Sequence, residues 1–269
     1  MQQGLRYKVR SIAFTFVAPT IGFLIILVIE MLLKIEVSKL LGAVINLIVV
    51  SLVAFVLFPR WLGIPFGQVS TREFLHQLGF YFPKDGWKHL VLGLMLAGLT
   101  LSGMLIASIL TGEYKVDGST VNLPHLVFSL NPALWEELFY RGVLMILLLR
   151  FTRSVKRAFA IQVVLFGLSH IKGADIGALV DVLSVMVMAI GFTFAAYQTR
   201  SLLAGIVFHY FHDAFLYFVQ PPDGTYSGVS ANVVFYGLLW LMIGVGCVVT
   251  RLAVDKFGVR AHKALYESG

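Results

Sequence analysis

Three ionisable residues, Glu136, Glu137 and Arg141, lie within one apolar segment near the middle of the chain. Ionisable groups in such segments are costly to bury and often mark functional sites. Glu137 and Arg141 are four residues apart, so they share a helix face and can pair. We interpret them as a structural ion pair that supports helix packing. Glu136 has no partner of this kind on its own helix, and we interpret this isolated carboxylate as a general base.

Two later apolar segments also carry ionisable residues. His170 lies at the end of one, while His209 and Asp213 lie four residues apart in another, on one helix face. His212 borders the same face. Each group alone is explained equally well as an interfacial histidine or as a buried His–Asp pair that holds helices together. The occurrence of such side chains on neighbouring segments favours a shared polar site instead. The four candidates for this site are Glu136, His170, His209 and Asp213.

The composition requires these residues to be positioned by membrane helices. The 269-residue chain is 58% hydrophobic and 13% charged, whereas soluble proteins are about 25% charged. Apolar runs of about 20 residues match the hydrocarbon thickness of a bilayer, and backbone hydrogen bonding in lipid requires helices. We predict an all-α integral membrane protein with a single membrane domain over residues 1–269. Its eight apolar segments lie at roughly 11–33, 40–58, 89–110, 133–149, 157–171, 177–197, 201–219 and 231–250.

The positive charges predict how these segments are oriented. With the N-terminus inside and eight spans, 16 of the 21 Lys and Arg residues fall on inner segments and four on outer ones, and Arg141 lies within a span. Cytoplasmic loops are rich in Lys and Arg, so this bias predicts an N-in, C-in topology. The same bias explains the net charge of +7 without a nucleic-acid partner. We expect a multi-pass protein in the plasma membrane of a prokaryote.

Two local features complete the predicted organisation. The first apolar segment resembles a signal peptide, but it is long and lacks a small-x-small cleavage site, so we interpret it as a retained span. Near residues 70–79, Ser70 and Glu73 fit a capping box and Gly79 fits a helix stop. We predict a short interfacial helix there, although an ordinary loop helix explains the pattern equally well. The single cysteine, Cys247, excludes an intramolecular disulfide and a CxxC metal site.

The predicted topology brings the four candidate residues to similar depths. At 1.5 Å per residue, His209 lies about 13 Å and Asp213 about 20 Å from Arg200 at the inner surface. Glu136 and His170 also fall between the middle of the membrane and its outer face. The depths differ by about 10 Å, which helix tilt can absorb. We therefore predict that the side chains meet around one water-accessible cavity.

In this order, the three groups of residues resemble the signature of the CAAX-processing and bacteriocin-processing (CPBP, or Abi) intramembrane proteases. The resemblance extends over roughly residues 120–220, which we take as the catalytic core, and the predicted eight spans also fit this family. Each motif alone is weak, but the ordered set is specific. The motifs are Glu136-Glu137-x-x-x-Arg141, Phe166-x-x-x-His170 and His209-x-x-x-Asp213.

The resemblance implies a glutamate-dependent, metal-free endopeptidase. Glu136 and His170 would activate a water molecule, and His209 and Asp213 would line the oxyanion site. The prenyl-protein proteases of the family carry Asn where this chain has Asp213. An ionised Asp cannot donate a hydrogen bond to an oxyanion. Asp213 is therefore either protonated or only orients His209.

We predict an intramembrane endopeptidase that cuts a peptide bond near the end of a membrane-anchored or lipid-modified protein or peptide. The resemblance implies CAAX-type or exported-peptide processing, and the predicted depth favours an anchored or exported substrate. No cofactor is expected. A zinc-dependent version stays open, because three His and two Glu could bind zinc although no His-Glu-x-x-His motif is present. A transporter or proton relay is another alternative, without the internal repeat typical of transporters. An inactive scaffold is the third alternative, and the pattern does not indicate an oligomeric state.

Overall fold

The computed structural model is helical throughout the part of the chain that it describes, apart from one pair of two-residue strands. This confirms the predicted all-α class. The predicted segments at 11–33 and 40–58 lie almost wholly outside this part, and Ser70 of the predicted capping box lies outside it as well. The described residues are 71–112, 114–118, 123–171, 173, 176–220 and 229–259, with six isolated positions before residue 50.

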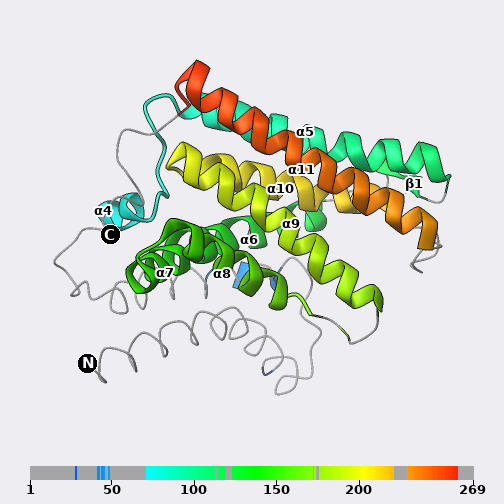
Figure 1. Cartoon of the computed structure of the whole chain (residues 1–269), viewed down its shortest axis with the longest axis horizontal. Coiled ribbons are helices and arrows are strands. Elements are labelled where there is room, and N and C mark those ends of the chain that lie inside the picture. The colour runs from blue at the N-terminus through cyan, green and yellow to red at the C-terminus, as the bar shows by residue number, and fades with distance from the viewer. Residues whose placement is uncertain are drawn as a thin grey trace.

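The helices form a layered bundle. In Figure 1, α5 and α11 lie along one side, α9 and α10 lie next to them, and α7 and α8 lie beyond α9 and α10. The short strands β1 and β2 pair antiparallel and join the chain after α5 to the chain after α10. In chain order the elements are α4 (Thr71–Gln77), α5 (Gly86–Thr111), β1 (Lys115–Val116), α6 (Leu123–Glu136), η3 (Glu137–Leu144), α7 (Met145–Thr152), α8 (Val155–Leu168), α9 (Ile176–Thr199), α10 (Leu203–Phe218), β2 (Val219–Gln220) and α11 (Val229–Phe257).

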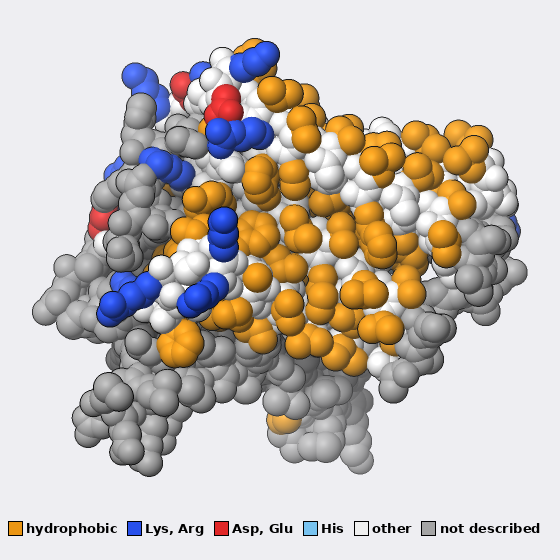
Figure 2. Space-filling view, in the orientation of Figure 1, with side chains coloured by type: hydrophobic (Ala, Val, Ile, Leu, Met, Phe, Trp, Pro, Cys, Tyr) orange, Lys and Arg blue, Asp and Glu red, His pale blue; other side chains and the backbone are white. Residues whose placement is uncertain are grey.

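Three of the described helices are long and apolar enough to cross a membrane. These spans are Gly86–Thr111, Ala178–Thr199 and Asn232–Phe257. A broad band of hydrophobic side chains covers the face shown in Figure 2. Leu179 of α9 and Leu241 of α11 are among the exposed hydrophobic residues. Lipid tails can cover such a band, whereas water would make it unfavourable. The chain is therefore a multi-pass membrane protein.

The basic residues gather at one end of this bundle, as the blue side chains of Figure 2 show. Contacts between distant segments place several helix ends together there. The Lys88 ammonium at the start of α5 donates to the carbonyl of Phe257 at the end of α11 over 3.3 Å. The Tyr81 hydroxyl donates to the carbonyl of Arg200, which follows α9, over 3.4 Å. One end of the bundle thus has the positive charge typical of a cytoplasmic face.

The predicted short helix near residues 70–79 is present as α4. It ends as predicted at Gly79, whose φ of 78° is left-handed. The amides of Gly79 and Phe80 bond back to the carbonyls of His76 and Leu75 over 3.0 and 2.9 Å, which is the hydrogen bonding of a glycine-terminated helix. Gly79 also accepts a hydrogen bond from the amide of Leu202 over 2.9 Å. This bond attaches α4 to the basic end of the bundle.

The predicted fourth segment, 133–149, is shorter than the observed helical path, mainly at its start. The helical path begins at Leu123 and continues through α6, η3 and α7 to Thr152. Pro132 lies inside α6, although proline is favoured in the first helical turn. The path also widens into a π-helix at η3, which carries Glu137 and Arg141. Short π-helical turns are frequent at functional sites.

Small residues allow the helices around the site to approach closely. A Cβ at Gly93 of α5 would lie 2.8 Å from the backbone oxygen of Ala204 in α10. A Cβ at Gly167 of α8 would lie 3.1 Å from the backbone oxygen of Val182 in α9. Small residues at membrane helix interfaces permit this kind of packing. One apolar cluster surrounds η3, α7 and α8, a second joins α5 to α11, and α9 and α10 contribute to both.

Candidate active site

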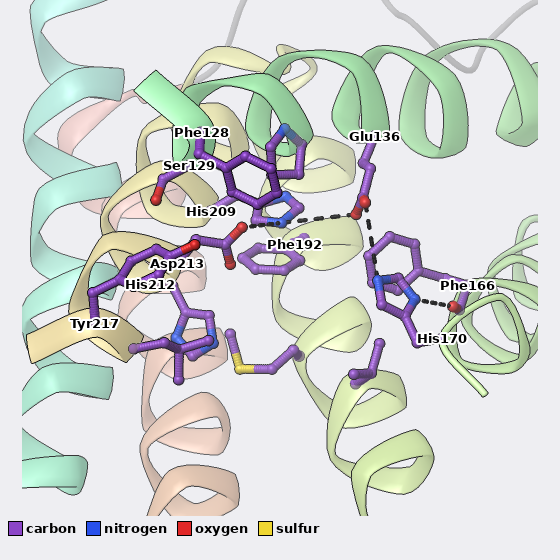
Figure 3. Close-up of a pocket in the computed structure, with 14 residues that line it drawn as sticks. Phe128, Ser129, Glu136, Phe166, His170, Phe192, His209, His212, Asp213 and Tyr217 are labelled. Atoms are coloured by element: carbon purple, nitrogen blue, oxygen red, sulfur yellow. Dashed lines mark hydrogen bonds and ion pairs between the residues drawn. The ribbon is translucent and has the colours of Figure 1, made fainter. Parts of the chain in front are cut away.

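A cavity of about 500 Å³ opens between α6, α8, α9 and α10. Figure 3 shows that ionisable side chains from three of these segments point towards its interior. Its size is within the range of small-molecule and peptide side-chain sites. The lining residues are Phe128, Ser129, Pro132, Glu136, Phe166, His170, Val185, Met188, Phe192, His209, His212, Asp213, Leu216 and Tyr217.

The carboxylate of Glu136 lies between two imidazoles on the cavity wall (Figure 3). Its Oε1 is 3.9 Å from Nε2 of His170, and its Oε2 is 3.8 Å from Nε2 of His209. The Glu136 side chain is only 9% exposed, and its Oε2 has no hydrogen-bond partner among the described residues. Both distances are too long for a direct hydrogen bond. They suit a single water molecule that contacts the carboxylate and an imidazole together.

His170 is held by its own helix end. Its Nδ1 lies 2.8 Å from the carbonyl oxygen of Phe166. A carbonyl only accepts, so Nδ1 carries the proton. In the neutral imidazole, Nε2 then presents a lone pair towards Glu136. Ser169 supports this arrangement, since its hydroxyl donates to the same carbonyl over 2.7 Å and accepts from the Tyr140 hydroxyl over 2.9 Å.

His209 is held by the second glutamate of the first motif. Its Nδ1 donates to Oε1 of Glu137 over 2.9 Å, and the same oxygen accepts from Nη1 of Arg141 over 3.0 Å. The predicted Glu137–Arg141 pair is confirmed, and both side chains are completely buried. The pair also fixes the ring of His209, so that its Nε2 faces the cavity.

Arg141 connects this pair to two further helices. Its Nε donates to the Thr193 hydroxyl of α9 over 3.3 Å, and that hydroxyl donates to the Gln162 side chain of α8 over 2.6 Å. The guanidinium lies over the rings of Phe166 and Phe192, at 4.2 and 5.2 Å from their centroids. Cation–π contacts of this kind stabilise a buried charge. The network therefore fixes η3, α8, α9 and α10 relative to one another.

Asp213 and His212 complete the polar part of the cavity. Oδ2 of Asp213 lies 3.6 Å from Nε2 of His209, the nitrogen that faces Glu136. The shortest contact of the His209 ring is therefore with Glu137 rather than with Asp213. The ring of Phe192 stacks on the ring of His209, with centroids 4.4 Å apart and planes at 16°. His209 is thus enclosed by two carboxyl groups on its cavity side and by one on its buried side.

The structure brings together every candidate residue that the sequence analysis singled out. The predicted depths of these side chains differed by about 10 Å, a difference that helix tilt can absorb. In the structure, Glu136, His170, His209 and Asp213 line one cavity. The residues that position them were missed. Ser169, Thr193 and Gln162 are uncharged, and a search for ionisable groups in apolar segments does not detect them. Short polar side chains within the spans were the available signal.

The cavity lies within a bundle of apolar helices, and its wall carries a buried carboxylate and two imidazoles that are positioned to contact one water molecule. Residues 119–215 match the family model of the type II CAAX prenyl endopeptidase Rce1-like proteins. Over these residues the chain is therefore similar to the Rce1-like type II CAAX prenyl endopeptidase domain, which is a peptidase domain. The match includes Glu136, His170, His209 and Asp213. Comparisons with curated proteins and with solved structures give no significant match.

Proposed function

We propose that this protein hydrolyses a peptide bond within the membrane by means of a water molecule that Glu136 and His170 activate. The observation that carries the proposal is the position of the Glu136 carboxylate, 3.9 Å from one Nε2 and 3.8 Å from the other. Glu136 is the first carboxylate of the motif, and its Oε2 has no hydrogen-bond partner within the described ranges. General-base catalysis requires a basic atom within reach of the water proton, directly or through one water.

In the proposed first step, the water oxygen attacks the carbonyl carbon of the scissile bond and Glu136 accepts the water proton. The lone pair of His170 Nε2 accepts a hydrogen bond from the same water and so orients it for attack. The new carbon–oxygen bond converts the carbonyl oxygen into an oxyanion. Glu136 then transfers its proton to the amide nitrogen, the carbon–nitrogen bond breaks, and a carboxylic acid and an amine result.

His209 is the proposed donor to the oxyanion. Glu137 occupies its Nδ1, so the ring can donate from Nε2 only as an imidazolium. Donors that are already oriented before charge develops give the largest stabilisation of such intermediates. The buried Glu137–Arg141 network supplies this orientation through the 2.9 Å bond to Nδ1. We propose that Asp213, 3.6 Å from Nε2, balances the charge of the imidazolium rather than fixing its ring.

The substrate is proposed to be a protein anchored in the membrane by a lipid or an apolar segment and cut near its C-terminus. We retain the N-in, C-in topology with about eight spans, in which the basic end of the bundle faces the cytoplasm. His209 and Asp213 lie six and ten residues from the start of α10, which is about 9 and 15 Å along the helix. A site at this depth can reach only a peptide bond that is itself drawn into the membrane. The proposed setting is the plasma membrane of a prokaryote.

The test is a comparison of protein termini in membranes that contain the wild-type protein or Glu136→Ala. Substrates should accumulate in an uncut form in the variant, and their new C-termini should be absent. Loss of a C-terminal tripeptide after a prenylated cysteine would identify CAAX-type processing, whereas a cut in an exported peptide would identify the other class. Identical termini in both membranes would contradict the proposed function.

A further inference from the structure

His212 is a third cavity histidine to which the proposed mechanism gives no role. It lies on α10, three residues after His209, and is 6% exposed. Its ring packs edge-on against Phe192 and Phe208, with centroids 6.4 Å away in both cases. These contacts hold the ring in place but give its Nδ1 no hydrogen bond to the residues that the structure describes. Figure 3 shows His212 on the cavity wall, beyond Asp213 from Glu136.

His212 differs in this respect from the other two histidines of the cavity. Nδ1 of His170 bonds to the carbonyl of Phe166, and Nδ1 of His209 bonds to Glu137. Nδ1 of His212 is buried and has no hydrogen-bond partner in the described part of the chain. Such a group lowers stability unless a partner compensates it. A phenylalanine at this position would pack against the same rings without that cost.

The position of His212 fits a partner that enters the cavity with the substrate. Three residues of α10 advance about 4.5 Å along the helix, and an extended peptide advances about 3.3 Å per residue. For a peptide that runs along α10 with its scissile carbonyl at His209, these advances place a neighbouring backbone amide within reach of His212. A neutral imidazole has one donor and one acceptor, and a peptide backbone offers the complementary groups.

We propose that His212 hydrogen-bonds to a backbone amide group of the substrate next to the scissile bond and holds the peptide in the cavity. The inference rests on the proposed function, because it requires a peptide in this cavity. His212 then contributes to binding and not to the chemical step. Its replacement should weaken substrate binding while the turnover of bound substrate stays nearly constant.

The probes are synthetic membrane-anchored peptides, prenylated or acylated, presented to the full-length protein in lipid nanodiscs. A probe is chosen because wild type cleaves it and Glu136→Gln does not. With this peptide, His212→Phe should raise KM roughly three- to tenfold and change kcat less than about twofold, as expected for one lost neutral hydrogen bond. His212→Asn, which keeps a donor and an acceptor, should recover part of the loss.

A matched control separates this effect from the loss of any buried histidine. His89 on α5 is also buried, at 1% exposure, and its Nδ1 also lacks a partner, but it is not part of the cavity lining. His89→Phe should leave KM unchanged. An equal KM in wild type and His212→Phe, or the same change in His89→Phe, would overturn the inference.

Ester analogues of the probe test the contact itself. Replacing the amide nitrogen by oxygen at a bond next to the scissile bond removes one backbone donor. At the bond that His212 contacts, the ester should bind wild type more weakly than the amide does. His212→Phe should bind the ester and the amide equally well. If, at both neighbouring bonds, the ester lowers the affinity of His212→Phe as much as it lowers that of wild type, the contact is refuted. If wild type cleaves no probe, the proposed function fails first, and the inference fails with it.

Discussion

Replacing Arg141 by methionine should lower the free energy of unfolding more than the loss of any exposed ion pair does. The guanidinium and the Glu137 carboxylate are both 0% exposed and 3.0 Å apart. Methionine fills much of the same volume but leaves the Glu137 charge buried with only His209 as a partner. Breaking a buried pair in this way costs about 3–5 kcal/mol. The loss of the cation–π contacts with Phe166 and Phe192 adds to this cost.

The chain contains a matched control for this prediction. Arg251 and Asp255 form a pair with the same four-residue spacing and a distance of 2.7 Å, but their side chains are 56% and 47% exposed. Arg251→Met should cost less than about 1 kcal/mol, because exposed pairs contribute little. Free energies of unfolding are measured for both variants by denaturation in mixed micelles.

A double variant separates charge burial from simple loss of packing. Glu137→Gln combined with Arg141→Met removes both charges, so its stability should return to within about 1–2 kcal/mol of wild type. Peptidase activity should stay low, because His209 keeps a hydrogen-bond acceptor at Nδ1 but loses the negative charge there. The reasoning is refuted if Arg141→Met is no less stable than Arg251→Met, or if the double variant is as unstable as Arg141→Met.

Three further results are expected. Gly205→Ala should lower activity roughly tenfold, because its Cβ would lie 3.0 Å from Oε2 of Glu137. A shift of Glu137 would move His209, and small displacements of catalytic groups are costly. Gly237→Ala, with open space around its Cβ, should leave activity unchanged. Ser169→Ala should lower kcat roughly three- to tenfold by loosening His170, and Ser169→Thr, which keeps the hydroxyl, should stay close to wild type; equal rates for both would contradict the positioning role. Activity should survive thorough chelation, and a loss that zinc restores would favour the zinc-dependent alternative.

The sequence made the candidate site predictable because buried charge in an apolar chain is rare. This argument selected Glu136, His170, His209 and Asp213 together with Glu137, Arg141 and His212, and the predicted depths and topology indicated one shared cavity; the family resemblance then indicated the four that do the chemistry. The bond between Glu137 and His209 could not be predicted, because it joins residues 72 positions apart and depends on how α10 turns towards η3. The sequence analysis therefore treated Glu137 only as the partner of Arg141.

The helix boundaries show where local sequence rules are overridden by tertiary packing. Pro132 favours a helix start by its own chemistry, yet it lies inside α6. The π-helical turn over Glu137–Leu144 has no periodic signature in so short a segment. By contrast, Gly79 follows the end of α4 as predicted, since a left-handed residue at a helix end is a local requirement that glycine meets without steric cost.

The most direct test of the account is the rate of peptide hydrolysis by purified Glu136→Gln in lipid nanodiscs. The substitution keeps the shape of the side chain and removes its basicity, and Asp85→Asn at an exposed carboxylate is the control. The account predicts a rate reduced roughly 10²- to 10⁴-fold for Glu136→Gln and an unchanged rate for Asp85→Asn. Cleavage by Glu136→Gln at the wild-type rate would contradict it.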